Sequence, residues 1–449
     1  VPTGKDSLSM KQKYPDGEVI SPGTVIISAA ANCNEISKVV EPVLQQNGQN
    51  IYYINVSQDN FKLGGSSFNQ VLNTIGNEAP DVTNSAFVKD TFNTIQKLIK
   101  ADKISAGHDV ASGGLITTLL EMCFADVNLG ADFDLSSLNE EDAIKVLFAE
   151  NSGLVFQADA SVETTLSENN IEFFTIGTAN NSGKVTIKNN EDNFSFDVAG
   201  MRDVWYKTSY LLDDKQTANG LAKNRFDNYK NQPLQYTFPK HFTGKLEDVI
   251  ANKVKQSHSN KEITSSQTPR NDGRPKAAII REKGSNSERE MANAMYLAGF
   301  DVKDVHMTDL ISGRETLEDI QFIGAVGGFS NSDVLGSAKG WAGAFKYNEK
   351  ANTALKNFFK REDTLSVGIC NGAQLWMELD LINPDHKIHG KLIHNDSKKH
   401  ESSFTSVKIQ ENNSVMLSSL AGTELGVWIS HGEGKFNLPE AEENYDIVA

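Results

Sequence analysis

TLSVGICNGAQLWMELDLI, residues 364–382, sets the architecture of the carboxy-terminal half of the chain. An apolar run typical of a buried strand, residues 365–369, ends at Cys370, and a helix-like run begins at Asn371. Glycines stand two residues before and two residues after the cysteine. This Gly-x-Cys-x-Gly pattern at a strand-to-helix junction is typical of a catalytic nucleophile presented on a sharp turn. The sequence therefore predicts that Cys370 is a nucleophile whose thiolate is stabilised by the helix N-terminus.

A Gly-Gly loop follows a second apolar strand-like run, residues 322–326. We expect the backbone N–H groups of Gly328 and Asn371 to form an oxyanion hole, because such donors come from the residue after the nucleophile and from a neighbouring strand's loop. A free cysteine is more often a buried structural residue than a nucleophile. The combination of strand, Gly-x-Cys-x-Gly, helix and separate Gly-Gly loop favours the catalytic interpretation of Cys370.

Strand-like and helix-like runs alternate along the rest of the carboxy-terminal half, which predicts a parallel, doubly wound α/β sheet. The expected strands there are residues 276–280, 302–305, 322–326 and 365–369, and the expected helices are residues 287–298 and 351–359. Upstream we expect an α+β body with strands at residues 23–30, 50–56 and 154–158, helices at residues 91–101 and 115–125, and a mainly helical stretch at residues 201–229.

The length of 449 residues predicts roughly two to four domains. Residues 255–275 are rich in Ser, Asn, Lys and Thr and lack hydrophobic periodicity, as an exposed linker does. We therefore divide the chain into a first domain at residues 1–240, a linker at residues 241–275 and a second domain at residues 276–449.

Composition excludes several classes of partner. With 43 Lys and Arg against 59 Asp and Glu, the formal net charge is −16, which disfavours nucleic acid and anionic membrane surfaces. No apolar run approaches the length of a membrane span, and no signal peptide is recognisable. The three cysteines lie far apart and fit neither a disulfide framework nor a Cys-x-x-Cys metal site. We expect a protein of the reducing cytoplasm.

Several segments carry a family resemblance. Residues 281–310, 327–342, 368–382 and 429–436 resemble the class I, triad-type glutamine amidotransferase domain of the phosphoribosylformylglycinamidine synthase family, which implies a flavodoxin-like fold. Upstream, GKDSLSMK (residues 4–11), LGGSSF (63–68), HDVASGGL (108–115), FAENSGLVFQ (148–157) and MRDVWYKTSY (201–210) resemble the second half of that family's duplicated AIR-synthetase-like domain. The first residue is Val1, and the chain starts inside what looks like a working motif, VPTGKDS (residues 1–7). We therefore expect it to be a piece of a longer polypeptide that supplies the missing N-terminal part.

The resemblance implies an ATP-dependent carbon–nitrogen ligase of purine biosynthesis with glutamine as the amide donor. Glutamine would be hydrolysed through a thioester on Cys370, and the ammonia would pass internally to the synthetase site. There ATP would activate the amide oxygen of formylglycinamide ribonucleotide, and ammonia would displace phosphate to give the amidine. The expected partners are therefore these small molecules and the rest of the polypeptide.

The resemblance also implies a glutamine pocket formed by Gly327, Phe329, Gln374 and His431. The family's catalytic His and the Glu two residues after it would lie beyond residue 449, so we expect a weakly active or inactive piece. His431 is also followed by a Glu two residues later, so it is an alternative candidate for the base. Only the geometry of the site decides which His acts as the base. The sequence departs from the family pattern at residues 331–332, where Asn-Ser replaces the usual Tyr-Gly.

For the synthetase half, the resemblance implies that Asp109 binds Mg²⁺ beside nucleotide phosphates, a ligand type that Mg²⁺ prefers. Gly113 would open the following helix at the phosphates. Ala111 would lie at the nucleotide, although it replaces a hydroxyl, and Lys5 would offer a charge to phosphate. An Asp before Gly-Gly is a helix-start signal about as often as a metal ligand, and GKDS is by itself an ordinary turn.

Two other functions compete with this interpretation. One is a free-standing cysteine hydrolase whose base is His431 and which has no synthetase function. The other is a catalytically silent packing module that contributes mainly an interface. Modification of Cys370 by a glutamine analogue and stabilisation by nucleotide discriminate among the three.

Overall fold

The computed structural model describes residues 3–7, 11–20, 24–33, 35, 38–231, 234–240 and 274–449. The described residues form two compact units, one that extends to Trp205 and one that begins at Tyr206. The linker predicted at residues 241–275 lies outside the described residues except for its last two positions. The domain boundaries proposed from the sequence stay predictions.

The carboxy-terminal unit contains a four-stranded sheet in which every neighbouring pair of strands is parallel. Its strands are β12 (Lys276–Arg281), β14 (Asp301–His306), β15 (Phe322–Ala325) and β17 (Leu365–Gly368), in the order β14-β12-β15-β17. In chain order this is 2-1-3-4, the order of a flavodoxin-like doubly wound sheet. The predicted α/β fold class is confirmed, and each predicted strand agrees with the observed one to within one residue.

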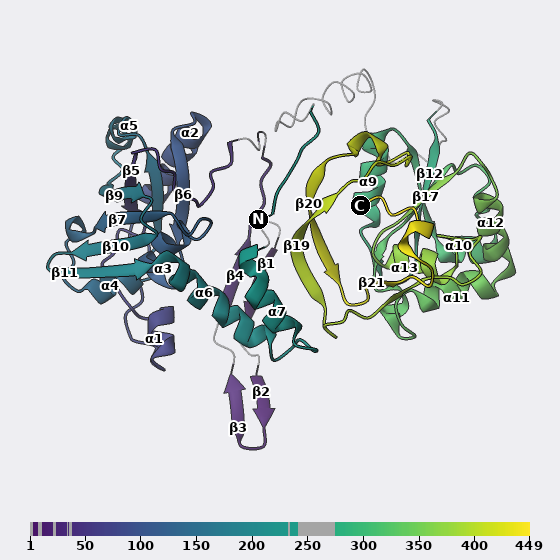
Figure 1. Cartoon of the computed structure of the whole chain (residues 1–449), viewed down its shortest axis with the longest axis horizontal. Helices are drawn as coiled ribbons and strands as arrows, with labels where there is room; N and C mark the ends of the chain where they lie inside the picture. Colours follow the sequence, from purple (N-terminus) through teal and green to yellow (C-terminus); the bar gives the residue numbers. More distant parts are fainter. Residues whose placement is uncertain are drawn as a thin grey trace. The chain divides into compact units, whose positions relative to one another are not determined.

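Helices cover both faces of this sheet (Figure 1). They are α9 (Glu288–Ala298), α10 (Met307–Ser312), α11 (Lys339–Tyr347), α12 (Glu349–Phe359) and α13 (Asn371–Glu378). Side chains of a strand alternate between its two faces, and in β12 Ile279 packs with Met295 of α9 whereas Ile280 belongs to the core that contains Trp341 of α11 and Phe358 of α12. Because both faces of β12 are covered by apolar cores, its consecutive residues from Ala277 to Ile280 are all apolar.

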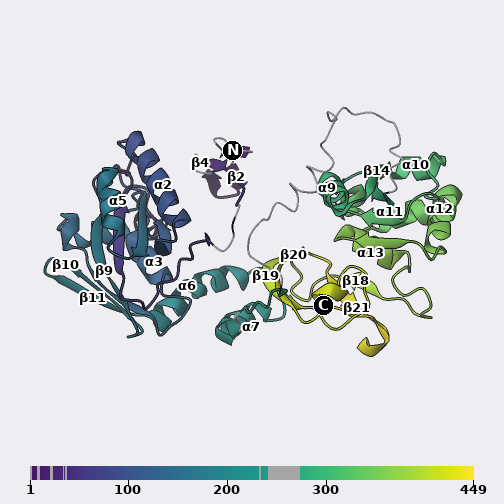
Figure 2. The same ribbon diagram turned by 90° about the horizontal axis from the view of Figure 1, so that it is seen from above.

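Smaller elements complete this unit. The two-stranded sheets are β13 (Ser285–Asn286) with β16 (Gly327–Gly328), β18 (Lys391–Ile393) with β21 (Lys435–Asn437), and β19 (Glu401–Lys408) with β20 (Glu424–His431). Figure 2 shows β18 and β21 beside α13. Short 3₁₀ helices in the described part of this unit span Tyr229–Asn231, Ser330–Asp333, Ser418–Leu420 and Glu442–Asn444, and one in the amino-terminal unit spans Ser136–Leu138.

The amino-terminal unit contains a seven-stranded mixed sheet in the order β11-β10-β7-β9-β5-β8-β6. Its strands are β5 (Asn50–Asn55), β6 (Ile104–Val110), β7 (Gly130–Asp134), β8 (Gly153–Ala158), β9 (Phe174–Asn180), β10 (Lys184–Asn189) and β11 (Asp192–Asp197). Further strands pair as β1 (Thr3–Ser7) with β4 (Thr24–Ser28) and β2 (Lys11–Tyr14) with β3 (Gly17–Ile20). Only β7 and β10 pair in parallel within the seven-stranded sheet.

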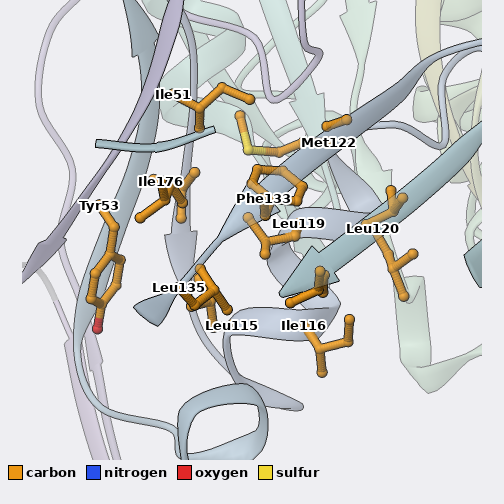
Figure 3. Close-up of a cluster of buried hydrophobic side chains, with 14 of the residues drawn as sticks. Ile51, Tyr53, Leu115, Ile116, Leu119, Leu120, Met122, Phe133, Leu135 and Ile176 are labelled. Carbon is orange, nitrogen blue, oxygen red and sulfur yellow. The ribbon is translucent and has the colours of Figure 1, made fainter. Parts of the chain in front are cut away.

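Two separate cores stabilise the amino-terminal unit. Its helices are α1 (Ser67–Val71), α2 (Ser85–Lys100), α3 (Gly114–Glu121), α4 (Ala143–Phe148) and α5 (Val162–Glu168). Figure 3 shows Leu119 of α3 beside Phe133 of the sheet, and Leu115 and Tyr53 belong to the same core. A second core contains Phe87 of α2 together with residues of α5 and β8.

The predicted helical stretch at residues 201–229 forms two helices, α6 (Val198–Asp213) and α7 (Leu221–Asn228). Residues 214–220 between them are turns and irregular structure. The predicted helix at residues 115–125 ends early, at Glu121, and the remaining residues form a turn. Among the helices of the described residues, none is long and apolar enough to cross a bilayer.

Candidate functional site

Cys370 occupies a sharp turn between β17 and α13. Its backbone has φ 55° and ψ −112°, a conformation that costs a residue with a side chain on the order of 1–3 kcal/mol. A Cβ on Gly372 would lie 2.1 Å from the carbonyl oxygen of Ala325, and one on Gly368 would lie 2.6 Å from the carbonyl oxygen of Gly372. Both flanking glycines are therefore required by close backbone packing, and the thiol of Cys370 is exposed.

The Gly-Gly loop after β15 lies against this cysteine. A Cβ on Gly327 would lie 3.1 Å from Cys370 Cβ and 3.6 Å from its Sγ. Gly328 has φ 98° and pairs with Ser285 between β16 and β13. Phe329 follows with 68% of its surface exposed. The structure thus brings together the two segments that were predicted to meet, while the roles of Gly327, Gly328 and Phe329 stay predictions.

The side-chain amide of Asn371 joins the start of α13 to the loop after Phe329. Asn371 is only 1% exposed. Its Oδ1 accepts a hydrogen bond from Ser330 Oγ (2.6 Å), and its Nδ2 donates to Asp333 Oδ1 (3.2 Å) and to Gln374 Oε1 (3.1 Å). The sequence indicated only the backbone N–H of Asn371, because no local pattern marks the partners of its side chain.

Gln374 connects α13 to the segment that contains His431. Gln374 Nε2 donates to the carbonyl oxygen of Glu433 at 2.9 Å. His431 Nδ1 lies 2.9 Å from Asn395 Oδ1, and Asn395 Nδ2 donates to the carbonyl oxygen of His431 at 2.8 Å. This contact holds the His431 ring through Nδ1 and leaves Nε2 as the nitrogen that could accept a proton, so the pocket role of His431 and its alternative role as the base for Cys370 both stay predictions.

In the amino-terminal unit, Asp109 presents an open carboxylate near the end of β6. Its side chain is 78% exposed, and Oδ1 lies 3.4 Å from Nδ1 of His108. The other ring nitrogen of His108 lies 3.0 Å from Glu121 Oε2, and Trp205 Nε1 donates to Glu121 Oε1 at 2.7 Å. A cavity of about 400 Å³ between α2 and the strands β6 and β8 has His108 and Asp109 among its lining residues.

This region fits Mg²⁺ only if the phosphates of a bound nucleotide supply further ligands. Within the described part of the chain, no group of three or more His, Cys, Asp or Glu side chains is arranged to hold a metal ion. Mg²⁺ is, however, commonly bound by one or two carboxylates together with substrate phosphates and water. A single open carboxylate such as Asp109 fits that mode and not a metal cage made of protein alone.

Glu150 joins two of the sequence motifs and was missed by the sequence analysis. Its Oε1 accepts from the backbone N–H of Ser67 at 2.8 Å and from that of Gly113 at 2.8 Å. Gly113 has φ 90° and is the N-cap of α3. Its N–H is thus already engaged, while Ala111 is exposed in the preceding turn. Lys5 lies in β1 opposite Ile26, and its side chain lies outside the described residues.

Comparisons with known proteins agree with both parts of the chain. Residues 274–449 match the CobB/CobQ-like glutamine amidotransferase domain, and residues 46–189 match the C-terminal domain of AIR synthase related proteins. A probable phosphoribosylformylglycinamidine synthase from Arabidopsis thaliana is 37% identical over 97% of this chain, which covers 31% of that protein. Phosphoribosylformylglycinamidine synthase from Dictyostelium discoideum is 36% identical over 99% of the chain, which covers 34% of that protein.

The chain belongs to the phosphoribosylformylglycinamidine synthase family. It spans about a third of the length of these curated relatives. A structure of PurLQS from Thermotoga maritima is 26% identical, with a TM-score of 0.31, over 37% of this chain and 71% of that chain. The Arabidopsis relative is named as chloroplastic/mitochondrial, and the cytoplasmic location expected for this member of the family stays a prediction.

Proposed function

We propose that the chain is part of an ATP-dependent ligase that converts formylglycinamide ribonucleotide and glutamine to formylglycinamidine ribonucleotide. The observation that supports this proposal most is the elbow at Cys370, where a Cβ on Gly327 would meet the cysteine side chain. It occurs in a chain whose relatives carry the name of that synthase. The carboxy-terminal unit would supply ammonia, and the amino-terminal unit would contribute to the synthetase site.

At the glutamine site, the Cys370 thiolate attacks the carbon of the substrate's side-chain amide. A C–S bond forms, the C–N bond breaks, and ammonia leaves after its nitrogen takes up a proton. Water then hydrolyses the thioester to glutamate and the free thiol. The N–H groups of Gly328 and Asn371 stabilise the oxyanion of each tetrahedral intermediate, a contribution worth about 3–4 kcal/mol per donor in comparable sites.

At the synthetase site, Asp109 would hold Mg²⁺ next to the phosphates of ATP. The bound cation would neutralise charge that develops on the phosphates during phosphoryl transfer. The Glu150 carboxylate accepts hydrogen bonds from the backbone N–H groups of Ser67 and Gly113. It thereby fixes the segments that contain these two residues relative to each other.

The amidotransferase proposal is tested on the polypeptide extended to the length of its relatives. Cys370→Ala should abolish amidine formation with glutamine, because the thioester cannot form. Amidine formation with ammonium chloride should stay within about twofold of the unmodified enzyme, since the synthetase site is untouched. Loss of both activities, or retention of the glutamine-dependent one, would contradict the proposed division of labour.

Nucleotide binding is tested on the chain as given. A ligand present at 100 times its dissociation constant stabilises the folded state by about 2.7 kcal/mol. MgATP should therefore raise the thermal midpoint of the amino-terminal unit, and Asp109→Asn should remove most of this shift. Asp192→Asn, an exposed position on β11, is the matched control and should retain it. Absence of any shift in the unmodified chain favours the silent packing module.

A further inference from the structure

The loop at residues 330–338 has an unusual backbone. Asn331, Ser332, Asp333 and Ala338 all have positive φ angles, of 51°, 55°, 47° and 57°. Residues with a Cβ rarely adopt such angles, since each costs on the order of 1 kcal/mol or more. The loop therefore depends on contacts with the rest of the unit to keep this conformation.

Some of those contacts are the bonds from Ser330 Oγ to Asn371 and from the Asn331 N–H to the carbonyl oxygen of Lys283, and two carboxylates make the others. Asp333 Oδ1 accepts from the backbone N–H of Ala338 at 3.3 Å and from Asn371 Nδ2 at 3.2 Å. Glu433 Oε2 accepts from the backbone N–H of Ser337 at 3.3 Å, while its Oε1 lies 3.2 Å from His394 Nε2. The two ends of the loop are thus tied to α13 and to the segment after β20.

These bonds close into a ring that includes the first turn of α13. Asn371 Nδ2 also donates to Gln374 Oε1, and Gln374 Nε2 donates to the carbonyl oxygen of Glu433. From Glu433 the ring returns through Ser337, Ala338 and Asp333 to Asn371. Loss of one member leaves shielded donors without acceptors, which is costly because Asn371 is buried and the Glu433 side chain is only 22% exposed.

We propose that Asp333 and Glu433 are positioning residues that set the affinity of the glutamine site by holding this loop and α13 in register. The Asp333 carboxylate acts through Asn371 and the Glu433 carboxylate acts through Ser337, while the backbone carbonyl of Glu433 accepts from Gln374. The proposal rests on the proposed glutaminase function of Cys370. Since neither carboxylate is in contact with the thiol, the intrinsic reactivity of Cys370 does not depend on them.

The first experiment compares two alkylating reagents on the purified chain. The rate of Cys370 modification is measured against the concentration of a diazo-ketone analogue of glutamine, and separately with iodoacetamide. In Asp333→Ala and Glu433→Ala, the analogue concentration for half-maximal rate should rise about tenfold or more, and the iodoacetamide rate should stay within about twofold. Asp333→Asn and Glu433→Gln keep an acceptor oxygen and should restore much of the affinity.

Asp396→Ala is the matched control, because Asp396 is an exposed carboxylate on a neighbouring turn that pairs with Lys435. It should change neither rate. A parallel fall in both rates would show that the elbow itself collapses and would overturn the positioning role. The proposal would also be overturned if both alanine variants needed the same analogue concentration for half-maximal rate as the unmodified chain.

Hydrogen exchange supplies a readout that needs no substrate. Amides of residues 330–338 and of the first turn of α13 should exchange faster in Asp333→Ala and Glu433→Ala and not in Asp396→Ala. Unchanged exchange would show that these carboxylates do not hold the loop. If the unmodified chain shows no saturation with the analogue, the proposed glutaminase function fails, and the exchange result still decides whether the carboxylates hold this loop.

Discussion

At the scale of single residues, the strained backbone of Cys370 presents the thiol at the head of α13. The sequence indicated this position because glycines two residues away on each side mark close backbone packing. It did not indicate the side-chain bonds of Asn371, since Ser330 lies 41 residues away in sequence and no local pattern relates the two. Glu150 escaped notice for the same reason, as its partners Ser67 and Gly113 are far away in the chain.

The strain at Cys370 gives a stability prediction. Cys370→Gly should raise the free energy of unfolding of the carboxy-terminal unit by about 1 kcal/mol relative to Cys370→Ala, because glycine adopts this conformation freely and alanine does not. Urea unfolding followed by the fluorescence of the buried Trp341 and Trp376 measures the difference. Equal stability of the two variants would show that the turn is not strained.

At the scale of elements, the contact between α13 and β15 requires a residue without a Cβ. Gly372→Ala should destabilise the carboxy-terminal unit by more than about 2 kcal/mol, since the new methyl group meets the Ala325 carbonyl at 2.1 Å. Gly343→Ala on α11 is the control, because its Cβ would meet Tyr347 at an ordinary 3.8 Å. That variant should be neutral or up to about 1 kcal/mol more stable. Similar losses in both would contradict the packing argument.

The elements themselves were largely predictable, and the reason is physical. Buried parallel strands such as β12 and β17 are short apolar runs, and α9 ends at Ala298, where the sequence predicted its end, before Gly299 with φ 104°. The loop at residues 330–338 was not predictable, because Asn, Ser, Asp and Ala do not mark positive φ angles in the way that glycine does. Its conformation is fixed by tertiary hydrogen bonds, which periodicity does not report.

At the scale of the whole molecule, each unit is built around cores of its own. Leu119→Ala should destabilise the amino-terminal unit and Phe345→Ala the carboxy-terminal unit, each by about 2–5 kcal/mol, because both side chains are fully buried. Hydrogen exchange in mild denaturant should accelerate within the altered unit. If Leu119→Ala accelerated exchange in β12 and β15 to the same degree, the division into two units would be contradicted.

The central claim is that Cys370 is the nucleophile of a glutamine site, and glutamine protection against alkylation tests it most directly. The diazo-ketone analogue should modify Cys370, and glutamine should slow this reaction. Iodoacetamide should also modify the exposed Cys33. Burial raises the pKa of Cys123 to about 12, so its thiol should stay unmodified in the folded chain. Modification of Cys33 by the analogue as fast as that of Cys370, with no protection by glutamine, would contradict the account.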